Sequence, residues 1–167
     1  MSTPLPRLSR PQRTSRAPVA ALEAFERLDA THREVMHTLE RLRQWVDQLE
    51  DEGITPATRA TADEVCRFFD GTARAHHAAE ERLVFPSLLD SGDAELVQHV
   101  QRLQQDHGWL EEDWLELQPQ LRAVVEGYSG FDADFLRAAV PVFTELYRDH
   151  ISLEESIVYP ESRRRQM

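Results

Sequence analysis

The sequence predicts an all-α protein that folds as an up-down-up-down antiparallel four-helix bundle. From Ala20 onward, apolar residues recur every three or four positions, and no stretch shows the two-residue alternation of a strand. Turn-forming residues divide this pattern into four long segments with short connections, which make successive helices antiparallel neighbours. Residues 76–86 and residues 150–160 both read H-x-x-x-E-E-x-aliphatic-V-aromatic-P. We call these two stretches the first block and the second block.

The first two helices are separated by a turn in residues 51–57. In this turn Thr55 is a suitable N-cap, and Pro56 suits the first position of the following helix. The second helix is expected to leave its regular course near Pro86. The first helix carries the seam Phe25, Leu28, His32, Val35, Leu39, Leu42, Val46 and Leu49. The second carries Val65, Phe69, Thr72, His76, Glu80 and Leu83.

The third and fourth helices follow a cap at residues 91–93 and a glycine-rich break at residues 127–130. The fourth helix is expected to stop at Pro160. Because Pro119 and Pro141 fall inside the two patterns, we expect kinks or early breaks there. The third helix carries Leu96, Val100, Leu103, His107, Leu110, Trp114, Leu117, Leu121 and Val124. The fourth carries Leu136, Ala139, Phe143, Leu146, His150, Glu154 and Ile157.

The length and composition are those of one soluble domain. With 167 residues, 41% of them hydrophobic, the chain is long enough to bury a sizeable core. Residues 1–18 contain arginines and prolines but no acidic residue, and we expect them to form a disordered tail, with a transit peptide or an interaction arm as alternatives. The bundle is expected in residues 19–162, followed by a basic C-terminal tail in residues 163–167.

The charge and the hydropathy exclude several classes of partner. A net charge of −11 argues against binding to nucleic acid or to an anionic membrane surface. No window approaches the roughly 18 apolar residues of a membrane span. The single cysteine, Cys66, cannot close an intramolecular disulfide, which fits a cytoplasmic protein, and we expect it to be buried.

Each predicted helix has one histidine in its apolar seam. These residues are His32, His76, His107 and His150. A buried imidazole without a partner costs a few kcal/mol. The blocks add Glu80 and Glu154, each on the same helix face as a histidine four positions earlier. Such a set of ligands is hard to stabilise in a core without a metal ion, and imidazole and carboxylate suit iron, manganese or zinc.

The other three histidines lie off the seams. His37 is expected on the surface, among arginines and glutamine. His99 shares a stripe with charged residues and is expected to face solvent or to be a hydrogen-bond partner rather than a ligand. His77 is one step off the seam, and we expect it to be partly exposed, with a supporting role in orienting His76 or Glu80 as the alternative.

The pattern H…HxxxE…H…HxxxE, with its doubled block, resembles that of the hemerythrin-like, or HHE cation-binding, family from about Ala20 to Pro160. Residues 29–34, Asp-Ala-Thr-His-Arg-Glu, match the first-helix pattern of this family. The resemblance implies a non-haem di-iron centre, with an oxo, hydroxo or water bridge, for which zinc or manganese could substitute. It implies four terminal ligands, His32, His76, His107 and His150, and two bridging carboxylates, Glu80 and Glu154.

The sequence departs from the oxygen-carrying members of that family at two positions. Where they have a second histidine on the third helix, this chain has Glu111, which is either a seventh ligand or a polar neighbour. Their last carboxylate is an aspartate five residues after the fourth-helix histidine, whereas Glu154 follows His150 by four. The sequence resembles the bacterial branch for iron-centre repair and nitric-oxide response at least as closely.

Three functions remain open. The leading one is a gas-binding, sensing or redox-responsive protein that binds O2 or NO, because six ligands give eight metal bonds and two octahedral ions need about twelve. The second is an iron donor or repair protein for damaged iron centres. The third is a ferritin-like iron oxidase or storage protein, which is disfavoured because those bundles use Glu-x-x-His. We expect no turnover of an organic substrate, since no zinc-protease motif or phosphate loop occurs, while a protein partner or a homodimer stays open.

Overall fold

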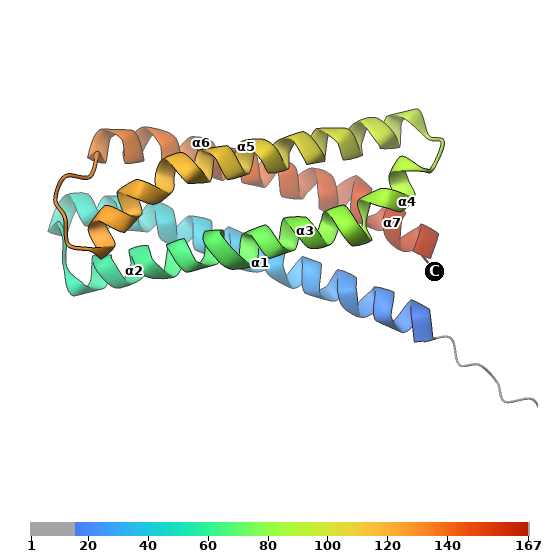
Figure 1. Cartoon of the computed structure of the whole chain (residues 1–167), viewed down its shortest axis with the longest axis horizontal. Coiled ribbons are helices and arrows are strands. Elements are labelled where there is room, and N and C mark those ends of the chain that lie inside the picture. The colour runs from blue at the N-terminus through green and yellow to red at the C-terminus, as the bar shows by residue number, and fades with distance from the viewer. Residues whose placement is uncertain (1–15, 167) are drawn as a thin grey trace, which may run out of the picture.

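The computed structural model describes residues 16–166, and within this range every regular element is helical (Figure 1). The prediction of an all-α protein is therefore confirmed. The α-helices are α1 (Arg16–Glu52), α2 (Pro56–Arg67), α3 (Ala73–Leu83), α4 (Phe85–Leu89), α5 (Ala94–Val125), α6 (Ala133–Leu153) and α7 (Tyr159–Gln166). Two π-helical segments, η1 (Phe68–Thr72) and η2 (Glu154–Val158), join α2 to α3 and α6 to α7.

The long helices pack into a bundle around a common interior. Helix α1 contacts α2 and α6, and α5 contacts the same two helices from the other side. In Figure 1 the continuous rod of α2, η1 and α3 lies along α1, and α5 and α6 lie side by side. Short connections at residues 53–55, 90–93 and 126–132 join these rods.

The start of α2 agrees with the expectation from the sequence. The Thr55 side chain accepts a hydrogen bond from the Thr58 backbone N–H at 3.1 Å, and the Thr58 hydroxyl accepts one from the Thr55 N–H at 2.8 Å. This capping box satisfies two amide groups that have no partner within the helix. Gly53, with φ of 70°, adopts the left-handed conformation that ends α1.

The three prolines in the helical patterns do not end their helices. Pro119 and Pro141 lie inside α5 and α6, which continue through both, so early breaks, one of the two expected outcomes, are wrong, while kinks stay a prediction. Each proline removes one backbone hydrogen bond, but buried neighbours such as Leu121 and Phe143 keep the helix packed in the core. The predicted stop at Pro160 is also wrong, because this residue falls in the first turn of α7 after a π-helical segment.

A layer of polar residues divides the core into two apolar clusters. Along α1, His32 lies between Leu28 of the smaller cluster and Val35 of the larger one. Along α5, His107 lies in the same way between Leu103 and Leu110. The larger cluster contains Cys66, which is buried as predicted, and burial raises the pKa of its thiol to about 12. His32 and His107 thus lie between two apolar layers of the core.

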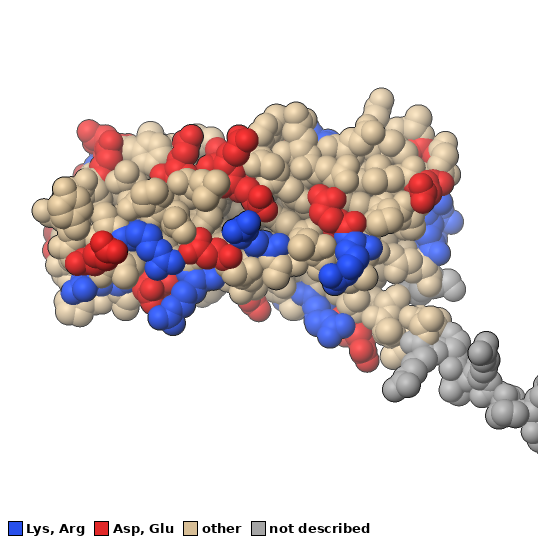
Figure 2. All heavy atoms as spheres, viewed as in Figure 1, with Lys and Arg blue, Asp and Glu red and all other residues tan. Residues whose placement is uncertain are grey.

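The two expected tails differ in how much of them is described. Of residues 1–18, those before Arg16 lie outside the described residues, and α1 begins at Arg16. Helix α7 extends through the arginine run to Gln166, with Arg163 paired to Asp29 and Arg164 bound to Glu161. Arginine and acidic side chains lie interspersed on the face shown in Figure 2. Among the described helices, none is long and apolar enough to cross a membrane.

Candidate metal centre

The six side chains predicted as ligands meet in the polar layer between the two apolar clusters. They come from different elements: His32 from α1, His76 and Glu80 from α3, His107 from α5, His150 from α6 and Glu154 from η2. All six are buried, and both glutamates are fully inaccessible to solvent. Two fully buried carboxylates require positive charge or several hydrogen bonds nearby.

The two oxygens of Glu80 face different histidines. Its Oε1 lies 2.9 Å from His76 Nε2 and 3.6 Å from His32 Nε2. Its Oε2 lies 3.1 Å from His107 Nε2. Burial raises the pKa of Glu80, but hydrogen bonds with the histidines, that with His107 first, outweigh this effect and hold the pKa well below its usual value. The carboxylate is therefore ionised in the centre of the bundle.

Glu154 repeats this arrangement from the opposite side. Its Oε2 lies 3.0 Å from His32 Nε2, while its Oε1 lies 2.9 Å from His150 Nε2 and 3.9 Å from His107 Nε2. One oxygen of each glutamate thus faces the pair His32 and His76, and the other oxygen faces the pair His107 and His150.

Several of these buried atoms lack a hydrogen bond. Within the described residues, neither oxygen of Glu154 and neither ring nitrogen of His150 has a partner of suitable geometry. Burial lowers the pKa of His150, but the charge of Glu154 and a contact with Asp106 outweigh it and raise the pKa to about 9. A buried polar atom without a partner costs a few kcal/mol. These oxygen and nitrogen atoms therefore suit the role of metal ligands. A bound cation would interact with them and displace the imidazole proton.

Three further carboxylates lie next to the outer ring nitrogen, Nδ1, of three of the histidines, and two of them form hydrogen bonds to it. Glu81 accepts a hydrogen bond from His107 Nδ1 at 2.9 Å, and Glu155 accepts one from His32 Nδ1 at 3.0 Å. These residues are the second glutamates of the two blocks. Each fixes the proton on Nδ1 and leaves Nε2 of the same ring with a free electron pair that faces the interior.

The third outer carboxylate is Asp106, which lies on α5 and is buried. Its Oδ2 is 3.5 Å from His150 Nδ1, and its Oδ1 accepts a hydrogen bond from Arg102 at 3.1 Å. Sequence reasoning missed all three outer carboxylates. The repeated E-E of the blocks was a signal for Glu81 and Glu155, but no local signal pointed to Asp106.

The aromatic residues of the blocks stack on the two histidines that Glu81 and Glu155 hold. Tyr159 stacks on His32, with ring centroids 5.0 Å apart and planes inclined by 12°, and Phe85 stacks on His107 at 5.6 Å and 23°. The Tyr159 hydroxyl donates a hydrogen bond to Glu80 Oε1 and lies 3.1 Å from His32 Nε2. Burial and the two buried glutamates raise the pKa of Tyr159, so its hydroxyl keeps its proton.

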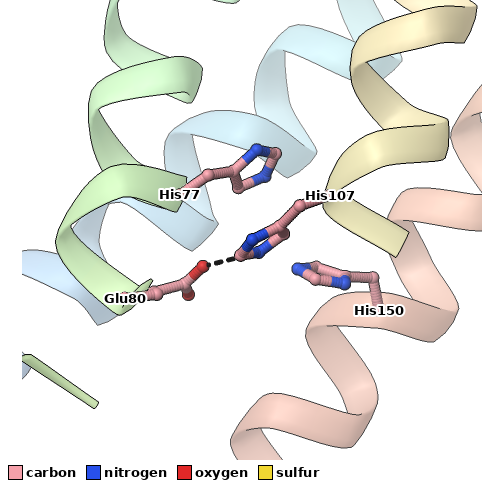
Figure 3. Close-up of side chains that lie close together, drawn as sticks. All are labelled: His77, Glu80, His107 and His150. Carbon is pink, nitrogen blue, oxygen red and sulfur yellow. Dashed lines mark hydrogen bonds and ion pairs between the residues drawn. The ribbon is translucent and has the colours of Figure 1, made fainter. Parts of the chain in front are cut away.

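His77 is buried, contrary to the expectation of partial exposure. Only 5% of it is exposed, and its ring stacks on that of His107 with centroids 4.1 Å apart. Burial, followed by the neighbouring His107, lowers the pKa of His77 to about 2, so the imidazole is neutral. The expectation was wrong because the buried face of α3 is wider than a single seam. Figure 3 shows His77 together with Glu80, His107 and His150.

The structure places the remaining predicted residues outside this cluster. Glu111 is exposed, and it lines a shallow depression together with Arg74 and His77. His37 is exposed, as expected from its neighbours in the sequence. His99 is half-buried, and its Nε2 lies 3.8 Å from Glu95.

The comparison with known proteins agrees with this geometry. The profile of the hemerythrin HHE cation-binding domain matches residues 23–162, so the chain belongs to this family. The chain is also similar to an uncharacterized protein of Haemophilus influenzae, with 29% identity over 135 residues that cover 81% of this chain and 76% of that protein. No solved structure matches the chain. The buried cluster of histidines and glutamates could hold a metal ion.

Proposed function

We propose that the chain holds two iron ions in the centre of an up-down-up-down four-helix bundle and binds O2 or NO there, without turnover of an organic substrate. The observation that carries this proposal is the division of the carboxylate oxygens. One oxygen of Glu80 and one of Glu154 face each pair of histidines. A carboxylate bridges two cations when each of its oxygens binds one of them.

Two positions follow from this division. The first position would be held by His32 and His76, the second by His107 and His150, and Glu80 and Glu154 would belong to both. Imidazole and carboxylate donors suit iron, and eight bonds from six side chains fall short of the roughly twelve that two octahedral ions need. When bound, iron supplies open coordination positions for a diatomic ligand and a change of oxidation state.

The side chains around the ligands prepare the site for a cation. Glu81 and Glu155 keep the Nδ1 protons of their histidines in place, so the Nε2 atoms point their free electron pairs inward. The Tyr159 hydroxyl is a hydrogen-bond donor directed at Glu80 Oε1, on the side of the first position. The two apolar clusters on either side of the layer limit the access of bulk water.

A small cavity that His77 helps to line supports a diatomic ligand. Its volume is about 110 Å³, and its lining includes His77, Phe69, Leu110, Trp114 and Tyr147. A water molecule occupies about 30 Å³ in the liquid, so O2 or NO would fit.

Anaerobic reconstitution with Fe²⁺ tests this proposal. The wild-type protein should bind two iron ions per chain, and its visible spectrum should change on addition of NO or O2. Glu80→Gln and Glu154→Gln should each lose the paired signal, because one oxygen of the bridge becomes an amide nitrogen that cannot bind the metal. His37→Ala serves as the surface control and should keep the wild-type spectrum. Binding of a single ion, or no spectral response to either gas, would contradict the proposal.

A further inference from the structure

We propose that His77 is a third imidazole ligand at the second position, beside His107 and His150. The two positions would then differ, since the first has two histidines and the hydroxyl of Tyr159 nearby, whereas the second has three histidines. This inference rests on the proposed function, because it requires a cation bound between Glu80 and Glu154.

The distances around His77 are those of residues that share one ion. His77, Glu80, His107 and His150 each offer one ligand atom, and these four atoms all lie within 4.8 Å of one another. Metal bonds of about 2.1 Å separate opposite ligands of one ion by about 4.2 Å and adjacent ligands by about 3 Å. In Figure 3 the four side chains reach the same space from α3, α5 and α6, with the ring of His77 over that of His107. An imidazole binds a metal ion in the plane of its own ring, and the His77 ring lies nearly parallel to that of His107. Binding of one ion by all four residues would therefore need the His77 ring to rotate out of this stack and the ligand atoms to move inward.

The hydrogen bonds around His77 also leave room for a ligand role. Its Nδ1 is buried and has no hydrogen-bond partner among the described residues. The Nδ1 atoms of His76 and His150 are likewise without a partner, whereas those of His32 and His107 are held by Glu155 and Glu81. A buried imidazole without partners destabilises a core, so its retention needs a compensating interaction. A cation at the second position would provide one.

The second block shows that packing alone does not require an imidazole here. The residue after His76 in the first block is His77, whereas the residue after His150 in the second block is Ile151. Ile151 is buried, with 6% exposed, and belongs to the larger apolar cluster. An aliphatic side chain therefore fills the equivalent position on the other side of the bundle. The polar ring of His77 gives the second position a donor that the first position lacks.

The test is metal titration of His77→Ile. This variant gives the first block the isoleucine that the second block has at the equivalent position, Ile151. Co²⁺ is the probe, because its visible absorption reports the number and type of its ligands. Wild-type protein should bind two Co²⁺ ions. His77→Ile should bind the first ion as the wild type does and the second at least about 100-fold more weakly, with an altered spectrum, since loss of an orienting residue alone costs roughly 10–100-fold.

Two further measurements separate a ligand role from a packing role. Metal-free His77→Ile should melt at or above the temperature of the metal-free wild type, because it removes a buried polar group. In His77→Gly, added imidazole should restore binding of the second Co²⁺ ion, whereas in His37→Gly it should change nothing. If His77→Ile bound both ions with wild-type affinity, the inference about His77 would be wrong and the proposed function would stand. A wild-type protein that binds no pair of ions would instead overturn the proposed function.

Discussion

The first and second blocks perform the same tasks with mirrored partners. In each block the first glutamate faces both histidine pairs, and the second glutamate holds a histidine from a neighbouring helix. Glu81 holds His107 of α5, and Glu155 holds His32 of α1. The aromatic residue of each block stacks on that same histidine. The repeat in the sequence is therefore a repeat in the geometry, and each block serves a histidine far from it in the chain.

The two blocks differ at two buried positions that face the site. His77 in the first block corresponds to Ile151 in the second, and Phe85 corresponds to Tyr159. Each difference adds one polar group on one side only, an imidazole on the side of His107 and a hydroxyl on the side of His32. The comparison teaches that one scaffold supplies two similar sets of histidine and glutamate, and that two substitutions make their polar surroundings unequal.

The π-helical segments are also placed unequally in the two halves. Segment η1 precedes the first block, whereas η2 lies within the second block and begins with Glu154. A π-helical turn inserts one residue into a helix and is frequent at functional sites. In the second half, the insertion begins at Glu154 itself, four residues after His150, and Glu154 points to the centre.

Metal removal should have the largest effect, because it affects both half-sites at once. Without a cation, six polar side chains remain in the interior, so we expect the free energy of unfolding to fall by about 4 kcal/mol for each ion removed, when metal was present at 1,000 times its dissociation constant. For a chain of this length, the loss of each ion lowers the melting temperature by roughly 8–16 °C. Thermal unfolding followed by circular dichroism, with and without a chelator, measures it. Equal melting temperatures would mean that hydrogen bonds inside the protein already satisfy the cluster.

Separate removal of the two outer glutamates should affect one half-site each. Glu81→Gln should weaken metal binding by the pair that contains His107, and Glu155→Gln by the pair that contains His32. Each loss is expected at roughly 10–100-fold, the usual effect of removing a carboxylate that orients a ligand histidine. Stepwise titration with Co²⁺ resolves the two positions. If both variants weakened both positions alike, the division into half-sites would be wrong.

Exchange of the two aromatic residues should have a smaller effect that is confined to the first position. Tyr159→Phe, which copies the first block, removes the hydrogen bond to Glu80 and should cost about 1–3 kcal/mol of stability in the metal-free protein. It should also shift the spectrum of the loaded protein after NO addition. Phe85→Tyr is the matched control, since it adds a hydroxyl on the other side. An unchanged spectrum in Tyr159→Phe would show that this hydroxyl has no part in the site.

Much of the site follows from helical spacing alone. Side chains three or four positions apart share a face, so the seam positions of His32, His76, His107 and His150 predict that they face one interior. The same rule could not place His77, because the buried face of a bundle helix spans at least about 100° and its limits depend on the neighbouring helices. The same rule could not predict the carboxylates that lie next to the Nδ1 atoms of the histidines.

Those partners lie far apart in the sequence. Glu155 and His32 are 123 positions apart, and no local pattern relates them. The helices themselves were predictable, but their ends were not. Pro119, Pro141 and Pro160 are local signals for a break, and packing of buried neighbours overrides the first two. The position of Pro160 in a first helical turn removes its cost.

The smallest expected effect concerns Asp70, which anchors η1 in the first half and is remote from the ligands. Its Oδ1 accepts hydrogen bonds from Trp114 Nε1 and Gln118 Nε2, both at 2.8 Å, and its Oδ2 accepts one from Arg122 at 2.8 Å. Burial raises the pKa of Asp70, but these hydrogen bonds, that with Trp114 first, outweigh it and lower the pKa below its ordinary value.

A carboxylate with a lowered pKa stabilises the fold when it is ionised. Its contribution is complete above the ordinary pKa of about 3.9 in the unfolded chain and disappears as the pH falls through the lower pKa in the folded protein. Asp70→Asn should therefore reduce the free energy of unfolding by about 1 kcal/mol at neutral pH, and by less in acid. Urea denaturation at pH 7 and pH 3 measures the difference. Because Asp70 does not touch the ligands, metal stoichiometry should stay unchanged, and a loss of either ion in this variant would show that η1 positions the first block.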